Sequence, residues 1–325
     1  MNYQNSLQRI ISYVVSDMEK KSIENLIWRN SFNPYKANRL AVLTDRSCFS
    51  SFPSKISPTF AKTLESYIAN PTLVAARIQN LPIGDVQIPT PIAKFDPKNK
   101  KDFTSEGVLI ALGLHLGYPY SYKNESDGDV VQNIFPVQSL ANLQSSKGSV
   151  ELTAHTELSC TKEPPDLLLL LCLKKGRSGA QAYTGIISLE DAVKILPLHH
   201  QKMLGKPVYR TEIDPSMRLN DQDAIHTAAF PIIRQNDGVR EYTYDVDFTK
   251  TDDIEGNAAL TALREVYQAV EQKVILEPGD ALIIKNRLAA HTRGAFSPRY
   301  DGTDRWLQRM IVSHKPRGFA LTTIA

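Results

Sequence analysis

The second half of the chain is rich in short apolar segments that are continuous or alternate with polar residues. Turn residues bound many of them, as where Pro278-Gly279-Asp280 precedes the run that starts at Ala281. This pattern is typical of β-strands separated by tight turns. Strands are predicted at 149–155, 166–173, 180–187, 207–212, 228–233, 281–286 and 305–313.

Other segments show helical periodicity, most strongly 256–273, where Leu260, Leu263, Val266 and Val270 line one face. The other predicted helices lie near 5–20 and over 59–69, 103–113 and 188–204. Helices therefore stand before and between groups of strands and do not alternate with single strands. That order predicts a mixed α and β protein, with a double-stranded β-helix core (the cupin-like jelly roll) and flanking helices.

No internal repeat, low-complexity segment or linker-like composition divides the 325 residues. One domain is therefore expected over 1–325. Within it, 1–120 is predicted to be a mainly helical N-terminal cover. Residues 121–325 are predicted to form the jelly-roll core, with a helical and loop insertion at about 188–275.

Composition narrows the class of partner. The chain is 42% hydrophobic, and its 38 basic and 35 acidic side chains are spread without a block of one sign. Neither nucleic acid nor a membrane is expected as a partner, so a small molecule is the natural ligand. The longest apolar run, 167–173, is too short to span a bilayer, and three scattered cysteines favour a reducing compartment. The cytoplasm is the expected location, and the pattern leaves the oligomeric state open.

A histidine and a glutamate stand two residues apart at the end of the strand predicted at 149–155. His155 and Glu157 should therefore point to the same side. This pair alone is a weak signal, because it also fits a structural histidine at a strand end. His291 follows 136 residues later, after another strand. Two imidazoles and one carboxylate form the set of ligands that non-haem iron(II) oxygenases use, with positions left open for a co-substrate and O2.

A pair of arginines follows the second histidine. Arg305 lies 14 residues after His291, and Arg309 shares its face of the predicted strand. Each guanidinium can bind a carboxylate through two hydrogen bonds, so the strand offers a pocket for two acids. The alternative is a pair of surface arginines beside an exposed Trp306.

These residues resemble a known family. His155-Thr156-Glu157, the Pro278-Gly279-Asp280 turn, His291 and the run from Phe296 to Arg309 are similar to the clavaminate synthase-like oxygenases, which include bacterial hydroxylases of free arginine, asparagine and lysine. The resemblance is most specific over 276–311, clear over 131–185 and faint in the first hundred residues. Glutamate at the last position of this His-x-Glu motif, where related oxygenases more often have aspartate, is itself typical of this group.

The resemblance implies a jelly roll that uses Fe(II), 2-oxoglutarate and O2 to hydroxylate an amino acid. By position, the metal ligands and catalytic centre would be His155, Glu157 and His291; the contacts to 2-oxoglutarate would be Arg305 and Thr184; and the contacts to the substrate would be Arg309, Ser145 and Gln132.

Two acidic residues and two departures bear on the substrate. Asp245 and Asp247 stand where arginine hydroxylases of this group carry a pair that binds the guanidinium, and alternation would aim both at one pocket. They also fit a solvated acidic loop. Lys285 stands where the family usually has an acidic residue, and Leu158-Ser159-Cys160-Thr161 replaces an aromatic and histidine-containing segment.

The implied reaction is hydroxylation of a free basic L-amino acid, arginine or lysine, at an unactivated side-chain carbon, with release of succinate and CO2. Desaturation, cyclisation or a carrier-bound amino acid are alternatives that use the same cofactors. A non-catalytic jelly-roll protein that binds an amino acid or 2-oxoglutarate is an alternative of another class.

Overall fold

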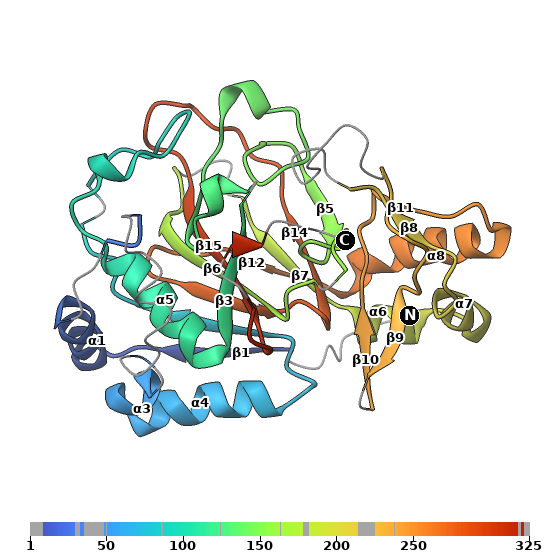
Figure 1. Cartoon of the computed structure of the whole chain (residues 1–325), viewed down its shortest axis with the longest axis horizontal. Helices are drawn as coiled ribbons and strands as arrows, with labels where there is room; N and C mark the ends of the chain where they lie inside the picture. Colours follow the sequence, from blue (N-terminus) through green and yellow to red (C-terminus); the bar gives the residue numbers. More distant parts are fainter. Residues whose placement is uncertain are drawn as a thin grey trace.

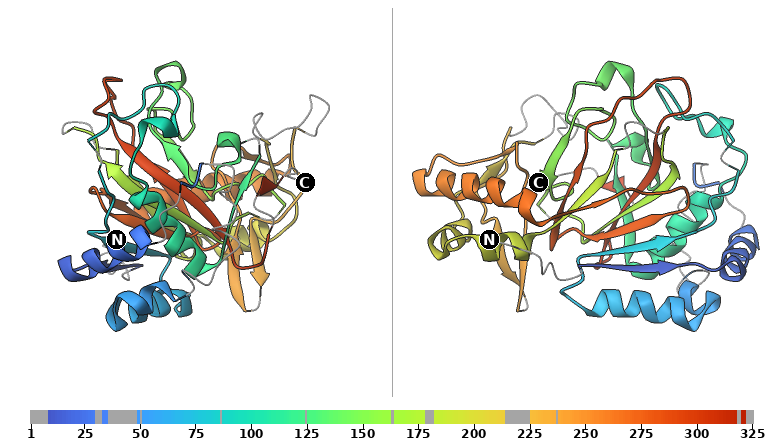
Figure 2. Two further views of the ribbon diagram at one scale, coloured as in Figure 1. Left: turned by 60° about the vertical axis from the view of Figure 1, so that its left-hand side comes forward. Right: turned by 180° about the vertical axis from the view of Figure 1, so that it is seen from behind.

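Two β-sheets pack face to face, and helices cover their outer faces (Figures 1 and 2). The computed structural model describes residues 9–29, 33–35, 49, 51–85, 87–123, 125–162, 164–177, 182–213, 225–236, 238–317 and 320–321. In this part of the chain, no helix is long and apolar enough to cross a membrane.

The strand order defines a large and a small sheet. The large sheet has the order β1 (Ile10–Val14), β2 (Ala75–Gln79), β13 (Ala281–Lys285), β6 (Leu167–Lys174), β15 (Trp306–Ser313), β3 (Tyr118–Tyr122) and β16 (Ala320–Leu321), with β4 (Gln132–Ile134) also beside β15. The small sheet has the order β12 (Glu271–Val274), β7 (Thr184–Ser188), β14 (Ala289–Arg293) and β5 (Leu152–His155).

Strand β6 explains how the layers are held together. Alternate side chains of a strand point to opposite faces, and this strand is apolar on both. Leu169 and Leu171 pack in one core, and Leu168 and Leu170 pack in another. The first core lies under the helices α1 (Asp17–Arg29), α3 (Phe52–Ile56), α4 (Pro58–Ala69) and α5 (Thr104–Leu116), and the second lies between the sheets.

A second group of helices covers the small sheet on the side away from the large one (Figure 1). Here α6 (Leu189–Ile195), α7 (Leu198–Leu204) and α8 (Ile254–Val270) enclose a third core. The two-stranded ribbons β8 (Arg210–Thr211) with β11 (Thr249–Lys250), and β9 (Ile233–Asn236) with β10 (Val239–Tyr242), belong to the same region. Short 3-10 turns are η2 (Pro97–Asn99), η3 (Ser126–Gly128) and η4 (Gln138–Leu140).

The jelly-roll prediction is confirmed, but the chain start differs from the expected helix near 5–20. Residues Ile10–Val14 form a strand that pairs in parallel with β2, and the helix begins only at Asp17. Ser16 and Glu19 explain the boundary, because the Glu19 carboxylate accepts from the Ser16 N–H at 2.8 Å and the Ser16 hydroxyl accepts from the Glu19 N–H. Residues 5–8 lie outside the described part. The first 120 residues thus supply strands β1 and β2 as well as helices.

The expected helix 188–204 is two helices, since Pro197 separates α6 from α7. The predicted strands 166–173, 281–286 and 305–313 correspond to β6, β13 and β15.

A buried polar network ties α5 to the strands that carry the site. Lys100 Nζ lies 2.5 Å from Glu106 Oε2, and neither side chain is exposed beyond 1%. Tyr35 donates to Glu106 and accepts from Asn133, whose amide oxygen accepts from the Trp306 indole. Asn133 lies on β4 and Trp306 on β15, so this network fixes both strands against the helix.

We predict that Glu106→Gln lowers the free energy of unfolding by about 3–5 kcal/mol, because it leaves the Lys100 charge buried without its partner. The double variant Lys100→Met/Glu106→Leu removes both charges and should lose markedly less. Urea denaturation measures both. A change below about 0.5 kcal/mol for Glu106→Gln would contradict the role given to this pair.

Candidate active site

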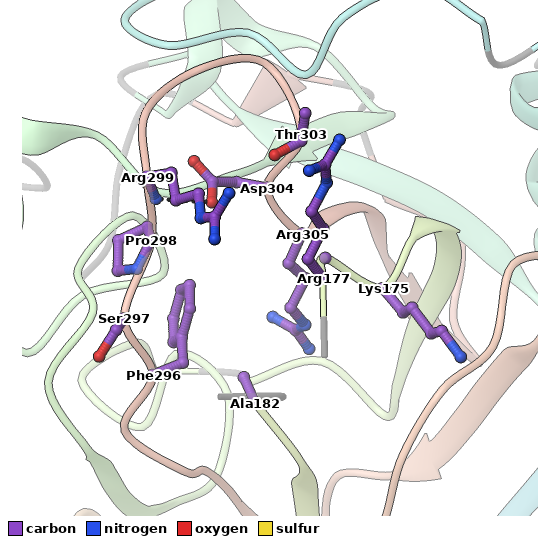
Figure 3. A pocket seen from close by; sticks show the side chains of 11 residues that line it. Lys175, Arg177, Ala182, Phe296, Ser297, Pro298, Arg299, Thr303, Asp304 and Arg305 are labelled. Atoms are coloured by element: carbon purple, nitrogen blue, oxygen red, sulfur yellow. Dashed lines mark hydrogen bonds between the residues drawn. The ribbon is translucent and has the colours of Figure 1, made fainter. Parts of the chain in front are cut away.

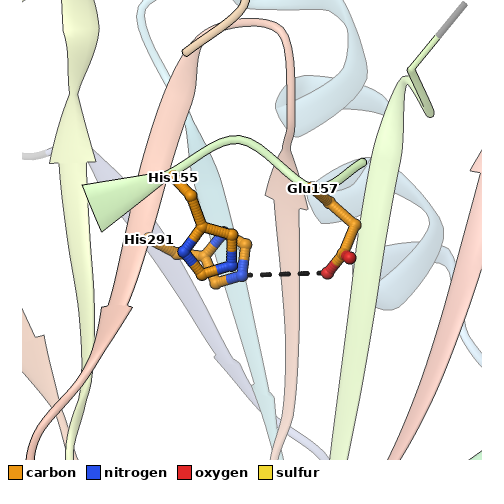
Figure 4. A group of neighbouring side chains, drawn as sticks. All are labelled: His155, Glu157 and His291. Atoms are coloured by element: carbon orange, nitrogen blue, oxygen red, sulfur yellow. Dashed lines mark ion pairs between the residues drawn. The ribbon is translucent and has the colours of Figure 1, made fainter. Parts of the chain in front are cut away.

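Two histidines face each other across neighbouring strands of the small sheet. His155 on β5 and His291 on β14 are register partners in an antiparallel pair, and their ring centroids are 4.1 Å apart. Glu157 follows just beyond the end of β5 and turns its carboxylate toward them (Figure 4). The three side chains predicted as metal ligands are therefore brought together.

The three groups lie close enough together to bind one metal ion. Their potential ligand atoms all lie within 4.8 Å of one another, and His291 Nε2 is 3.9 Å from Glu157 Oε2. His155 Nδ1 is 2.8 Å from the Thr153 carbonyl, which only accepts, so Nδ1 is the donor in this contact and Nε2 is the nitrogen left to face a metal. Burial, with His155 and Arg309 nearby, holds the pKa of His291 well below its usual value, so that ring is neutral.

Asn286 fixes the position of Glu157. Its side-chain oxygen accepts from the Glu157 N–H at 2.6 Å, and its amide nitrogen donates to the Glu157 carbonyl at 3.1 Å and to the Pro165 carbonyl at 2.9 Å. Asn286 is completely buried. Leu158, the next residue, has a φ of 54°, so the chain turns sharply just after the carboxylate. Asn286 is therefore a positioning residue for the metal ligand.

The triad opens into a cavity of about 590 Å³ between the two sheets. Among the residues predicted from the sequence, those that line it are Gln132, Ser145, His155, Glu157, Thr184, Asp245, His291, Arg305 and Arg309.

Arg305 is a buried cation with little compensation from the described residues. Its Nη2 lies 3.4 Å from the Thr184 hydroxyl, a long hydrogen bond, and burial lowers the pKa of the guanidinium to about 10. A buried charge without a strong partner is costly. An anion in the cavity beside Thr184 would supply that partner.

Arg309, in contrast, is tightly paired. Its Nη1 donates to Glu157 Oε1 at 3.0 Å and its Nε donates to Gln132 Oε1 at 2.8 Å, while Nη2 also pairs with Glu125. Burial alone would lower the pKa of Arg309, but the two carboxylates outweigh it and raise that pKa. The guanidinium thus joins the metal ligand to the loop that carries Glu125.

Four buried side-chain atoms of residues that line the cavity lack a hydrogen-bond partner in the described part of the chain: the Ser145 hydroxyl, Glu125 Oε2, His291 Nδ1 and Arg293 Nε. Arg293 holds the loop around Ser145, because its guanidinium donates to the Ser145 carbonyl at 2.9 Å and the Val150 carbonyl at 2.7 Å. A hydroxyl and a carboxylate oxygen are therefore available for a ligand.

The expected convergence of Asp245 and Asp247 is not what the structure shows. Asp245 lines the cavity, but its carboxylate also accepts from the N–H groups of Asp247 and Phe248, which makes a turn out of the predicted extended segment. Asp247 is absent from the lining, and its carboxylate accepts from the Thr153 hydroxyl at 2.6 Å. Burial raises the pKa of Asp245, although His155 opposes the shift.

The departures from the family pattern have separate explanations. Lys285 is not part of the cavity: its ammonium donates to the carbonyls of Tyr67 and Asn70 at 2.7 and 2.9 Å and so caps the end of α4. Leu158 and Cys160, in contrast, do line the cavity.

Several residues of the site were not predicted from the sequence, and a sequence pattern could have indicated one of them. Arg293 follows His291 by two positions on a strand and so shares its face. Glu125 stands in a polar loop, which the sequence pattern would assign to solvent. Glu212 follows the short strand β8 and forms an isolated bridge with a residue that is not adjacent to it in sequence. The contacts of Asn286 become visible only in the folded structure.

Comparison with known proteins agrees with this geometry. The family model described as "Taurine catabolism dioxygenase TauD, TfdA family" matches residues 99–311. L-asparagine oxygenase from Streptomyces coelicolor is 30% identical over 244 residues, which cover 72% of this chain and 69% of the relative. Clavaminate synthase 2 from Streptomyces clavuligerus is 28% identical over 238 residues, 72% of each chain.

A solved structure extends the likeness to most of the chain. The crystal structure of asparagine oxygenase in complex with Fe(II), 2S,3S-3-hydroxyasparagine and succinate has a TM-score of 0.81, 25% identity and a coverage of 94% of both chains. The donor set of two imidazoles and one carboxylate in this chain fits the iron of that complex. The protein therefore belongs to the TauD/TfdA dioxygenase family, as a clavaminate synthase-like oxygenase that depends on iron(II) and 2-oxoglutarate.

Proposed function

We propose that this enzyme hydroxylates a free amino acid with a basic side chain and releases succinate and CO2. The observation that carries the proposal is one cavity in which His155, Glu157 and His291 meet two buried arginines. A metal and two carboxylates can thus be bound together, as a 2-oxoglutarate and an amino acid require.

Arg305 and Thr184 are the proposed contacts to the distal carboxylate of 2-oxoglutarate. Arg305 is buried and weakly paired, and both side chains line the cavity. When iron(II) is bound to the triad, it supplies the activation of O2 that is coupled to decarboxylation of 2-oxoglutarate. The chain itself neutralises the far end of the co-substrate and fixes its distance from the triad.

Arg309 and Ser145 are the proposed contacts to the substrate's carboxylate. The guanidinium has five N–H groups and makes four hydrogen bonds, and the Ser145 hydroxyl has no partner in the described part of the chain. Gln132 and Glu125 lie on the same guanidinium and can accept from the substrate's ammonium. This arrangement favours a free amino acid over a carrier-bound one, which has no carboxylate to offer.

The charges that line the cavity balance one another. Four acidic residues, Glu125, Glu157, Glu212 and Asp245, and four basic residues, Lys147, Arg293, Arg305 and Arg309, line it. An iron(II) ion and a 2-oxoglutarate dianion also cancel. A basic amino acid then brings one net positive charge, so its side chain needs a carboxylate beside it.

The side chain of the substrate would point to Asp245 and Glu212. Both line the cavity, and the Glu212 N–H donates to the Phe248 carbonyl in the turn that Asp245 begins. Two carboxylates from neighbouring segments favour a cationic group. Glu212 thus takes the place that the sequence pattern gave to Asp247.

We predict that Arg305→Gln impairs mainly the binding of 2-oxoglutarate and that Ser145→Ala impairs mainly the binding of the amino acid. Arg305→Gln should weaken 2-oxoglutarate binding by about 10- to 150-fold, because it removes charged hydrogen bonds, and leave the amino-acid KM nearly unchanged. Ser145→Ala should raise the amino-acid KM by about fivefold without affecting 2-oxoglutarate. Succinate production, with each substrate varied in turn, measures both. Equal effects on the two substrates would refute the separate subsites.

We predict that Asp245→Asn lowers kcat/KM for arginine or lysine by about 10-fold or more, since a charged contact is lost, with a much smaller effect on neutral amino acids. Asp247→Asn is the matched control and should change little. The assay is mass spectrometry of reactions with all proteinogenic amino acids, where a gain of one oxygen marks hydroxylation and a loss of two hydrogens marks desaturation. Exclusive turnover of neutral amino acids by the unmodified enzyme would overturn the assignment of a basic substrate.

A further inference from the structure

A second pocket of about 410 Å³ is also lined by Arg305 (Figure 3). The turn 175–177 forms one wall, the loop 296–299 forms another, and residues 303–305 complete it. Its lining contains four cationic side chains: Lys175, Arg177, Arg299 and Arg305.

The acidic groups near this pocket do not cancel its charge. Asp304 lines it, but its carboxylate accepts from the backbone N–H groups of Arg299 and Tyr300 at 2.9 and 2.6 Å. Lys175 pairs with Glu277 at 2.8 Å at the surface. The fully exposed Asp301, whose pKa is lowered mainly by Thr303, interacts more weakly with Arg299 and Arg177. The lining therefore carries a net positive charge, since four cationic side chains stand against the one carboxylate of Asp304.

This pocket and the active-site cavity have one lining residue in common. Arg305 lines both. Phe296 lines the basic pocket, and the guanidinium of Arg293, which lines the cavity, lies 5.5 Å from its ring centre. Gly176 packs so closely on the Arg305 backbone that an added Cβ would lie 3.2 Å from the Arg305 nitrogen. The turn 175–177 is thus seated directly on the residue proposed to bind 2-oxoglutarate.

From this arrangement we infer that the basic pocket is an entrance for dicarboxylates, through which 2-oxoglutarate reaches Arg305 and succinate leaves. The amino acid would use the opening of the main cavity. The inference rests on the proposed function of Arg305. A pocket lined with one sign of charge raises the local concentration of the opposite ion and its association rate. Arg177 and Arg299 would provide this attraction at the rim, and Arg305 would receive the anion at the floor.

The test is the rate at which 2-oxoglutarate associates with the iron(II)-loaded protein under anaerobic conditions. The buried Trp306, next to Arg305, is a fluorescence reporter for stopped-flow measurement. In Arg177→Glu/Arg299→Glu the association rate constant should fall about 10-fold or more at low salt, and the difference should shrink as salt is added. Binding of the amino acid, followed in the same way, should not change.

The matched control is Lys62→Glu/Lys315→Glu, which alters the net charge equally at exposed positions outside both pockets. It should associate with 2-oxoglutarate at the wild-type rate. The milder Arg177→Gln/Arg299→Gln should show a smaller loss and serves if the charge reversal impairs folding.

Three results would overturn the inference: an unchanged rate constant in both arginine variants, an equal loss in the lysine control, or an equal loss for the amino acid. If the wild-type protein itself does not bind 2-oxoglutarate, the proposed function fails first, and the two failures are thereby distinguished.

Discussion

The antiparallel register between β5 and β14 is the constraint on which the site depends. It sets His291 opposite His155, so two residues far apart in the sequence present adjacent imidazoles. A shift by one residue would turn one ring to the opposite face of the sheet. The packing of the small sheet between two cores fixes the strands in this register. Asn286 positions the third ligand, Glu157, through hydrogen bonds to its backbone N–H and carbonyl.

Charge compensation is the second principle of the site. Arg309 is bound by Glu125 and by the ligand Glu157, so the protein compensates most of this cation itself. Within the described residues, Arg305 makes one long hydrogen bond, to Thr184. The first arrangement orders the substrate end of the cavity, while the second reserves a cation for a ligand. A buried cation without a strong partner lowers stability, and an anionic ligand beside Arg305 would remove that cost.

Some elements could be predicted from the sequence because a single physical cause explains their residue pattern. Strand β6 is recognisable because both of its faces are buried, and His155, Glu157, His291 and Arg305 because their spacing matches the chemistry. Local sequence patterns gave wrong predictions where side-chain hydrogen bonds to the backbone determine the conformation of the chain. The Asp245 carboxylate accepts hydrogen bonds from the N–H groups of Asp247 and Phe248 and so forms a turn. The hydrogen bond between Ser16 and Glu19 marks the start of the first helix, and Ile10–Val14 before it form a strand. Glu125 and Glu212 could not be found in this way, because only the tertiary fold brings their loops to the cavity.

The central claim is that one cavity couples the oxidation of 2-oxoglutarate to the oxidation of an amino acid. Isotope labelling with ¹⁸O₂ tests it most directly, with mass spectrometry of both products. One labelled oxygen is expected in succinate and one in the hydroxylated amino acid, and the two products should form in equal amounts. An amino-acid product that forms without 2-oxoglutarate, or that carries oxygen from water alone, would contradict it.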